Sequence, residues 1–380
     1  MQQSIRRTLV PVALGSMIVL TSALALARND GFAKSTTLAV YGDAPYGTTP
    51  TDTSELDATP AFVDAINADP DVELVVHVGD IHSGKQYCTL AYNRAVHELW
   101  SQFEDPLIYT PGDNEWTDCH KKAEGGGAYN AATGLIDYVL DTSGAPVDYA
   151  SGNPVANLEL IRSIFFPQPG LTLGAKRAVL SQHFLYDRSH RTDANYVENV
   201  MWDQSGVLFV TLNVPGGSNN DQDVWYGATT ETVAQTQERD ERTGADLRWL
   251  EFAFGAAKFL RAKGLVIVMQ ADMWDPEKGV AHQAGYEPFV SSVAQNTKAF
   301  GRPVLMLNGD SHVYLSDNPL SAADPLNHMH PGYDVPNFHR IVVHGSTLPL
   351  EWLRLTVDPR ANSATAENAF GPFSWERVIE

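Results

Sequence analysis

The stretch VELVVHVGD, residues 72–80, has the pattern of a short buried strand that ends in Gly79 and Asp80. Similar apolar runs occur at residues 37–43, 106–113, 206–214, 265–272 and 304–310. Five of the six runs end in an aspartate, and in four of them a glycine precedes that aspartate. Short apolar runs bounded by turn residues are typical of strands in a sheet that is covered on both faces. The six runs therefore predict the central strands of the fold.

Amphipathic segments with a helical period lie between the predicted strands. They cover residues 57–69, 90–103, 244–264 and 286–300. Alternating strands and helices favour an α/β fold with a largely parallel sheet. The last apolar segments have no helices between them and predict antiparallel strands that complete a second sheet, at residues 339–346, 351–359 and 373–379. Residues from about 120 to 200 are rich in Gly, Asn and Ser and are interpreted as an insertion within a single domain, residues 36–380.

The N-terminus has the features of an export signal. Arg6 and Arg7 precede an apolar run that ends in Ala-Leu-Ala at residues 25–27, the small-x-small pattern of a signal-peptidase site. Residues 1–27 are therefore predicted to be a cleaved signal peptide, and the mature protein to be secreted or periplasmic, without membrane attachment. The alternative is an uncleaved membrane anchor, although this run is marginal for a bilayer, which needs about 20 apolar residues.

The chain is strongly acidic, with 46 Asp and Glu residues against 26 Lys and Arg residues and a formal net charge of -20. Such a charge repels nucleic-acid backbones and anionic lipid surfaces at long range. A nucleic-acid-binding function is therefore disfavoured.

Two cysteines, Cys88 and Cys119, occur in the sequence, and both would meet an oxidising compartment after export. We expect them to form a disulfide that closes a loop of about 30 residues and contributes roughly 3 kcal/mol in the chain-entropy model. Two separate buried thiols are the alternative.

The aspartates at the predicted strand ends form a second pattern. Parallel strands present their carboxyl ends at one edge of a sheet, and ligands of open α/β folds bind there. Five carboxylates would meet at this edge: Asp43, Asp80, Asp113, Asp272 and Asp310. A single Gly-Asp after a strand is usually a turn, but turns alone hardly explain four of them. Crowded carboxylates must be protonated or bind a metal, so the pattern predicts a cation site.

Five short blocks carry a family resemblance. They are YGDAPYG (41–47), VGDIHSG (78–84), PGDNEW (111–116), VMQADMW (268–274) and NGDSHVY (308–314). In this order they resemble the metal-binding blocks of calcineurin-like metallophosphoesterases, which include purple acid phosphatases, and the resemblance extends over roughly residues 37–346. It implies a four-layer α/β/β/α sandwich of two mixed sheets. It also implies two divalent metal ions, bridged by Asp80, that activate a hydroxide for phosphoester hydrolysis.

Three blocks depart from the family pattern. The first has DAP at 43–45 where the family has Asp-x-His, the third has DN at 113–114 in place of Asn-His, and the last has DSH at 310–312 in place of His-x-His. Imidazole is thus largely replaced by oxygen. An oxygen-rich set favours Mn²⁺, Mg²⁺ or Ca²⁺, although the family leaves Fe and Zn possible.

The resemblance implies a ligand set for each ion. Asp43 and His312 would hold one ion together with the bridging Asp80. The other ion would be held by Asp80, Asp113, Asp310 and a residue of the fifth block, Gln270 or Asp272. Gln270 stands at the family's histidine position, whereas Asp272 is the better ligand for a hard cation, so both remain candidates.

The leaving alkoxide needs a proton, which the family takes from the histidine of its third block. Asn114 stands at that position and is retained as a catalytic candidate, although its amide cannot supply the proton. His82 and His120 are the candidate replacement acids, and either could instead be only a hydrogen-bonding partner. Glu115 is expected to orient a ligand.

The favoured function is a secreted metal-dependent phosphatase or phosphodiesterase that acts on a phosphorylated small molecule or ester. The alternative is a catalytically degenerate protein that binds metal or phosphate on the same fold. A plain Ca²⁺-stabilised secreted protein would explain the carboxylates but not their order at successive strand ends. The surviving set of ligand candidates favours the enzyme.

Overall fold

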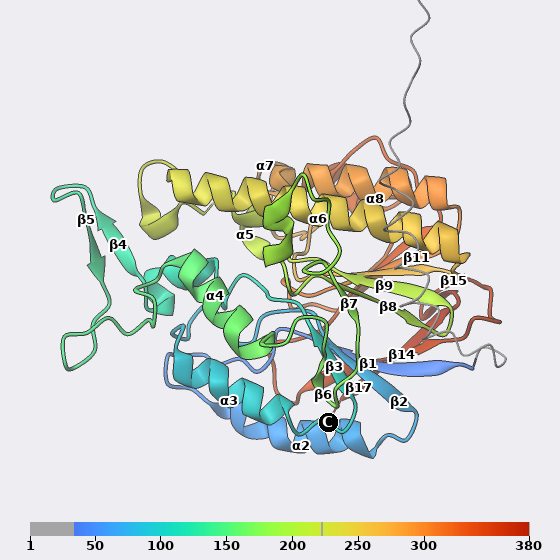
Figure 1. Cartoon of the computed structure of the whole chain (residues 1–380), viewed down its shortest axis with the longest axis horizontal. Helices are drawn as coiled ribbons and strands as arrows, with labels where there is room; N and C mark the ends of the chain where they lie inside the picture. The colour runs from blue at the N-terminus through green and yellow to red at the C-terminus, as the bar shows by residue number, and fades with distance from the viewer. Residues whose placement is uncertain (1–33, 222, 380) are drawn as a thin grey trace, which may run out of the picture.

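The computed structural model describes residues 34–221 and 223–379, so the predicted signal peptide lies outside the described residues. Two large sheets are stacked face to face, and helices cover the outer face of each sheet (Figure 1). This arrangement confirms the expected four-layer α/β/β/α sandwich of two mixed sheets. In the described part of the chain, no helix is both long and apolar enough to cross a membrane.

The first sheet has eight strands in the order β15-β16-β17-β14-β1-β2-β3-β6. Its parallel centre consists of β1 (Thr36–Tyr41), β2 (Val72–His77) and β3 (Pro106–Tyr109). The antiparallel strands are β14 (Glu351–Val357), β17 (Phe373–Ile379), β16 (Ala369–Gly371), β15 (Ser363–Ala366) and β6 (Leu173–Gly174).

The second sheet has seven strands in the order β12-β13-β11-β10-β9-β8-β7. Its parallel strands are β9 (Val207–Thr211), β10 (Leu265–Val268), β11 (Val304–Asn308) and β13 (Phe338–Val342). The antiparallel edges are β12 (Leu315–Asp317), β8 (Val200–Gln204) and β7 (Leu180–Ser181).

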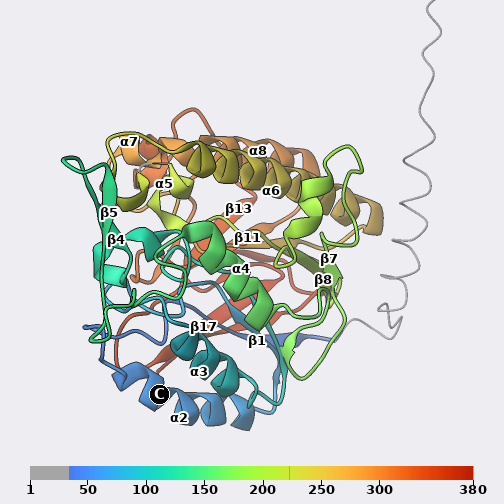
Figure 2. The same ribbon diagram turned by 60° about the vertical axis from the view of Figure 1, so that its left-hand side comes forward.

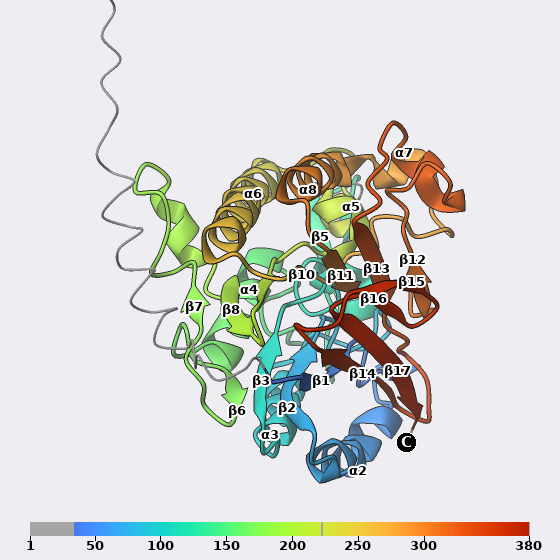
Figure 3. The same cartoon turned by 90° about the vertical axis from the view of Figure 1, so that its right-hand side faces the viewer.

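The C-terminal strands correct one prediction. They were expected to complete the second sheet, but β14 pairs antiparallel with β1 in the register Thr36↔Val357, and β17 pairs with β14. Figure 3 shows both strands in the lower sheet, beside β1 and β2. Only β13 of this region joins the second sheet, where it runs parallel to β11. The free edge of β1 takes β14 as its partner, and the hydropathy of the C-terminal strands does not indicate which of the two sheets they join.

Three apolar layers hold the sandwich together. Leu38, Val76, Val266 and Leu305 belong to the core between the two sheets. Outside the first sheet lie α2 (Ser54–Ala68), α3 (Leu90–Trp100) and α4 (Pro154–Phe165), and outside the second lie α6 (Val233–Leu260) and α8 (Glu287–Phe300). Both faces of each sheet are therefore buried, which explains why the strands are continuous apolar runs.

Residues 120–200 follow β3 and precede β8. The hairpin of β4 (Gly127–Asn130) and β5 (Leu135–Tyr138) extends from the body at the left of Figures 1 and 2. By contrast, α4 packs against the first sheet, where Ile161 and Phe165 are buried. The remaining short elements of the chain are α5 (Gly216–Asn220), α7 (Val280–Gln283), η1 (Asp118–His120), η2 (Lys122–Glu124), η3 (Arg191–Asn195), η4 (Trp225–Gly227), η5 (Ala284–Tyr286) and η6 (Pro325–Met329).

The predicted disulfide is present. Cys88 and Cys119 are bonded, with their Cα atoms 5.8 Å apart. Cys88 lies just before α3, and Cys119 lies in η1, directly after the third block. The bridge therefore fastens the loop that carries Asp113 and Asn114 to the start of α3.

Candidate metal centre

The strands of both sheets bring their aspartates to one cavity. Asp80 and Asp113 follow β2 and β3 of the first sheet, and Asp310 follows β11 of the second. Together with Asn114 and His312 they line a cavity of about 550 Å³. Residues up to 232 positions apart thus share one site because parallel strands end at the same edge.

Asp43, Asp80 and His312 form the tightest group. Each offers a ligand atom, and these atoms all lie within 4.8 Å of one another. Oδ1 of Asp43 is 3.5 Å from Nε2 of His312 and accepts the backbone N–H of Asp310 at 2.9 Å. Oδ2 of Asp43 is buried and has no hydrogen-bond partner among the described residues. A buried carboxylate oxygen without a partner is costly, and a cation held by these three residues would satisfy it.

Asp80 is the most heavily hydrogen-bonded of the predicted ligands. Its Oδ2 accepts the hydroxyl of Tyr46 at 2.7 Å, the side-chain amide of Asn114 at 3.1 Å and that of Gln270 at 3.1 Å. The hydroxyl of Tyr46 also accepts the second amide hydrogen bond of Asn114 at 2.8 Å. These three donors fix the orientation of the carboxylate that the resemblance makes the bridging ligand.

Gln270 is placed as a donor, which corrects its predicted role as a ligand. Its Oε1 accepts the backbone N–H of Gly216 at 2.6 Å. The amide nitrogen therefore faces the carboxylates, and it donates to Asp113 at 3.0 Å as well as to Asp80. An amide NH₂ has no lone pair for a metal, so Gln270 orients two predicted ligands without being one.

Asp113 and Asp310 follow strands of different sheets and lie close to the same residue, Gly216. A β-carbon placed on Gly216 would lie 2.3 Å from Oδ2 of Asp113 and 2.9 Å from Oδ1 of Asp310. The two carboxylates thus face the same glycine, whose lack of a side chain leaves room for them. Together with Asp80, these two carboxylates would give the second predicted ion three oxygen ligands. Carboxylate oxygens suit hard cations.

Asp272 is engaged elsewhere, which corrects the other candidate of the fifth block. Its Oδ1 forms a short ion pair with Arg340, and both side chains are fully buried. The same oxygen accepts the N–H of Trp274 at 3.0 Å, and Oδ2 accepts the hydroxyl of Ser311 at 2.9 Å. Because Arg340 neutralises this carboxylate and both of its oxygens accept hydrogen bonds, Asp272 is a structural ion-pair partner.

Backbone geometry explains why glycines precede the aspartates. A β-carbon on Gly112 would lie 2.0 Å from Oδ1 of Asp80, and one on Gly309 would lie 2.2 Å from Oδ2 of Asp43. Each glycine therefore makes space for the aspartate of a neighbouring block. Asp80 itself has φ 63°, in the left-handed region that strains most side chains. Backbone strain of this kind accumulates at functional sites.

Burial and mutual repulsion shift the carboxylates toward protonation. Burial is the largest cause that raises the pKa of Asp43, Asp80 and Asp310 well above the ordinary range, and the charge of Asp113 raises each of them further. The pKa of Asp113 is raised to about 7, chiefly by burial. The site thus holds more negative charge than its surroundings stabilise, which is the electrostatic condition of a cation site.

The sequence matches the family model of calcineurin-like phosphoesterases over residues 37–314. The chain belongs to the calcineurin-like phosphoesterase family. A search of curated proteins found no match. Similar solved structures include a purple acid phosphatase from yellow lupin (Lupinus luteus) seeds, with 12% identity and a TM-score of 0.40 over 91% of this chain and 52% of the lupin chain. Another is a dimetal phosphatase from Danio rerio, with 11% identity and a TM-score of 0.43 over 90% of this chain and 98% of that chain. This chain thus spans about half the length of the lupin protein.

The third block of this calcineurin-like chain offers no imidazole at the cavity. Asn114 lines the cavity, and its side-chain amide donates hydrogen bonds to Tyr46 and Asp80. It therefore orients these two side chains and does not transfer a proton. Glu115 accepts the hydroxyl of Tyr109 at 2.5 Å and the N–H of Gly112 at 2.7 Å. Glu115 therefore holds the loop of the third block in place. Its expected role in orienting a metal ligand stays a prediction.

The two histidines considered as acids lie away from the cavity lining. His82 is fully buried, its Nδ1 contacts the carbonyl of Ser83 at 3.1 Å, and it lies against the Cys88–Cys119 disulfide. His120 accepts the N–H of Tyr226 at 2.9 Å through Nδ1. Burial lowers the pKa of both imidazoles to about 4, so both are neutral at pH 7. Neither residue is among those that line the cavity, and the prediction that one of them serves as the acid loses its geometric support.

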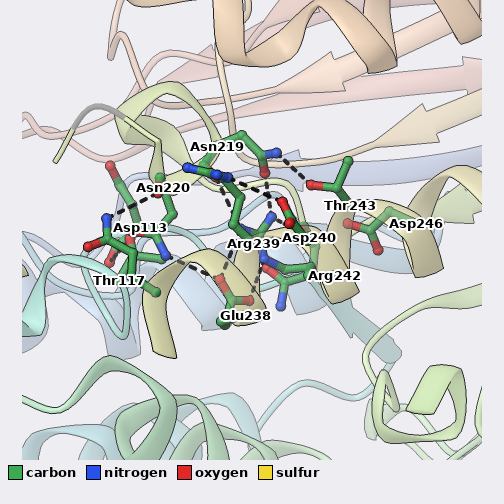
Figure 4. A network of polar contacts seen from close by, with 12 residues as sticks. Asp113, Thr117, Asn219, Asn220, Glu238, Arg239, Asp240, Arg242, Thr243 and Asp246 are labelled. Carbon is green, nitrogen blue, oxygen red and sulfur yellow. Dashed lines mark hydrogen bonds and ion pairs between the residues drawn. The ribbon is translucent and has the colours of Figure 1, made fainter. Parts of the chain in front are cut away.

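The glycine-rich segment after β9, residues 213–220, contains a left-handed turn beside the site. Residues 217–220 all have φ near +60°. The buried Arg242 of α6 holds this turn by hydrogen bonds to the side chain and carbonyl of Asn219, and it pairs with Glu238 at 2.7 Å (Figure 4). The guanidinium also lies 5.3 Å from the ring centre of Trp116 in the third block. Arg242 thus joins the turn that follows Gly216 to the loop that carries Asp113. In the sequence, only the glycine pair at 216–217 indicates this turn.

Proposed function

We propose that this calcineurin-like protein is a metal-dependent phosphatase or phosphodiesterase that works with two divalent cations. One observation carries the proposal: Asp43 has a buried, unpartnered carboxylate oxygen within reach of Asp80 and His312, next to a cavity large enough for a small phosphoester. Family membership supports the same reaction class.

Each proposed ion has its own set of ligands, and Asp80 belongs to both sets. Asp43, His312 and Asp80 would hold the first, and Asp80, Asp113 and Asp310 the second. When bound, the ions supply an activated hydroxide and neutralise the phosphoryl charge. Tyr46, Asn114 and Gln270 keep Asp80 oriented through the three hydrogen bonds on its Oδ2. Because five of the six predicted donors at the two positions are carboxylates, counting Asp80 for each ion, we propose Mn²⁺, Mg²⁺ or Ca²⁺ as the resident ions.

We also propose that the mature protein is exported and takes a phosphorylated small molecule or ester as substrate. The disulfide supports an oxidising compartment, and the N-terminal pattern supports a cleaved signal. Lys85 lines the cavity and offers a cation to the phosphate or its substituent. N-terminal sequencing of protein purified from the exported fraction tests the cleavage site after Ala27.

A catalytically degenerate binding protein is the second candidate. The observation in its favour is that three donors already saturate Oδ2 of Asp80, so its charge is partly satisfied by the protein alone. Such a protein would bind phosphate or a cation without turnover.

The deciding experiment combines metal analysis with hydrolysis. The purified protein is stripped of metal, reloaded separately with Mn²⁺, Mg²⁺, Ca²⁺, Zn²⁺ or Fe²⁺, and assayed with phosphomonoesters and phosphodiesters. We expect two ions per chain and hydrolysis of at least one ester class. Two bound ions with no hydrolysis under every condition would favour the binding protein, and absence of metal binding would reject the enzyme and any cation-binding role.

A further inference from the structure

The proposed reaction lacks a proton donor among the residues that the sequence singled out. An alkoxide leaves phosphorus slowly unless its oxygen is protonated as the bond breaks. His82 and His120 do not line the cavity, and His312 is assigned to a cation. An acid for this reaction must therefore come from the other residues that line the cavity.

Glu55 lines the same cavity as Asp80 and His312. It lies in the first turn of α2 and is only 5% exposed. Its Oε2 accepts the backbone N–H of Tyr46 at 2.6 Å. Within the described residues no hydrogen bond reaches its other oxygen, Oε1. Glu55 is thus a buried carboxyl that is anchored through one oxygen and leaves the other available.

Tyr46 links Glu55 to one of the predicted cation ligands. Its backbone N–H binds Glu55, and its hydroxyl binds Oδ2 of Asp80 at 2.7 Å. The backbone N–H and the hydroxyl of Tyr46 thus connect Glu55 to Asp80, and both carboxyl groups line the same cavity. We propose that Glu55 is the general acid that protonates the leaving oxygen, an inference that rests on the proposed phosphoester hydrolysis.

The surroundings of Glu55 favour a protonated carboxyl near neutral pH. Burial, the largest cause, raises its pKa to about 7, while the N–H of Tyr46 lowers it and the charge of Asp52 raises it. The N-terminus of α2 opposes this shift because its dipole favours the carboxylate. Tyr92 of α3 also lies near enough to interact electrostatically. Other titratable groups that line the cavity are Tyr46, Asp80, Lys85, Asp113, Asp310 and His312.

The proposed step balances with water as the second substrate. The oxygen of a hydroxide forms a bond to phosphorus while the bond from phosphorus to the leaving oxygen breaks. The electron pair of that bond stays on the leaving oxygen, which takes the proton of Glu55 and departs as an alcohol. Glu55 remains as a carboxylate and regains a proton from solvent. The hydroxide is replaced by a water molecule that loses one proton, so ester and water become a phosphate product and an alcohol.

The test compares two esters of matched size. p-Nitrophenyl phosphate releases a stable phenolate that needs little protonation, whereas p-nitrobenzyl phosphate releases an alkoxide that needs a proton. If the parent prefers diesters, the corresponding methyl diesters are used. We expect Glu55→Gln to lose roughly 10²–10⁴-fold in kcat on the benzyl ester, the usual contribution of a general acid, and far less on the phenyl ester. Glutamine keeps the acceptor for Tyr46, so the fold should be retained.

The matched control is Asp57→Asn. Asp57 lies in the same first turn of α2 but is exposed, so its removal takes away the same helix-terminal charge without reaching the cavity. The control should hydrolyse both esters as the parent does. The parent itself provides a second measurement: its kcat on the benzyl ester should fall above about pH 7, and that on the phenyl ester should lack this fall.

The outcomes separate the two proposals. The role of Glu55 would be overturned, without affecting the proposed function, if Glu55→Gln lost the same factor in kcat on both esters or kept parental rates on both. The same conclusion would follow if the pH profiles of the parent did not differ between the two esters. A parent that hydrolyses neither ester class with any of the metals would overturn the proposed function and this inference with it.

Discussion

Gly309 packs directly against the carboxylate of Asp43, so closely that a β-carbon on the glycine would lie 2.2 Å from Oδ2. The two residues belong to different sheets, Asp43 at the end of β1 and Gly309 at the end of β11. The oxygen in question is the one that has no partner among the described residues. The Gly-Asp pair at 309–310 thus affects two predicted ligands: Asp310 is one itself, and Gly309 leaves room for the carboxylate of the other, Asp43.

We expect Gly309→Ala to weaken cation binding strongly. The added methyl group must displace the Asp43 carboxylate or the β11 backbone, because real β-carbons do not approach so closely. Isothermal titration of the metal-free protein with Mn²⁺ measures the loss. Gly255→Ala is the control, since Gly255 lies in α6 with open space around its Cα, and this change should leave binding intact and stabilise the helix by roughly 0.5–1 kcal/mol. Equal affinity in the two variants would contradict the close-packing argument.

Asp80→Asn should abolish turnover while the protein stays folded. The substitution keeps the shape of the side chain but removes one negative charge from the proposed bridging position, so activation of the hydroxide by two ions should fail. We expect kcat to fall by several orders of magnitude, measured with the best ester of the parent. Asp187→Asn, whose side chain is 57% exposed, is the control and should retain parental activity. Parental rates in Asp80→Asn would rule out the two-ion mechanism.

Asp272→Asn should damage stability more than cation affinity. The change leaves the buried guanidinium of Arg340 short of one carboxylate, although Asp317 still pairs with it at 2.6 Å. Breaking one partner of a buried ion pair typically costs about 3–5 kcal/mol, and the retained Asp317 should keep the loss near the lower end. Urea unfolding measures the stability, and Mn²⁺ titration of the folded variant measures the affinity. A large loss of affinity with parental stability would restore Asp272 as a ligand.

Cations should stabilise the protein more at high pH than at low pH. In the metal-free protein burial raises the pKa of Asp113 from 3.8 to about 7, so between these values the folded state binds more protons than the unfolded state. Stability due to this group is therefore complete below about pH 4 and is lost as pH rises through about 7. Cations bind the deprotonated carboxylates and remove the loss.

Calorimetry at pH 5 and pH 8, with and without Mn²⁺, checks this expectation. The increase in Tm on adding Mn²⁺ should be larger at pH 8, and Asp113→Asn should reduce the difference between the two pH values. An increase that is equal at both pH values, or larger at pH 5, would contradict the assigned titration.

The sequence predicted the elements that depend on local pattern. Apolar runs that stop at Gly-Asp located the central strands, and the shared edge of parallel strands brought Asp43, Asp80 and His312 to one place. The metal-binding roles of these residues remain predictions. What failed depends on single long-range contacts: Gln270 became a donor because the N–H of Gly216 occupies its oxygen, and no pattern in the fifth block reveals that neighbour.

The ion pair of Asp272 could not be predicted from the sequence for the same reason. Its partner Arg340 lies 68 residues further along the chain, in a strand that reads as plain apolar β structure. His82 was an acid candidate because it lies two residues beyond Asp80, but the chain after Asp80 turns that imidazole into the protein interior. Its role as an acid therefore has no geometric support from the cavity lining. Glu55 lies in an ordinary amphipathic helix, and only the cavity distinguishes it from the acidic residues around it.

The Cys88–Cys119 bridge has a consequence for when the protein becomes competent during its biogenesis. The loop that it closes contains Asp113, Asn114 and Glu115, so oxidation of the two thiols adds a covalent tether to the contacts of Glu115 and Trp116 that also hold the third block. A chain with both thiols reduced would carry the same predicted ligands on a loop without this covalent tether. Under the proposed export, this covalent tether would form only after the chain had reached an oxidising compartment.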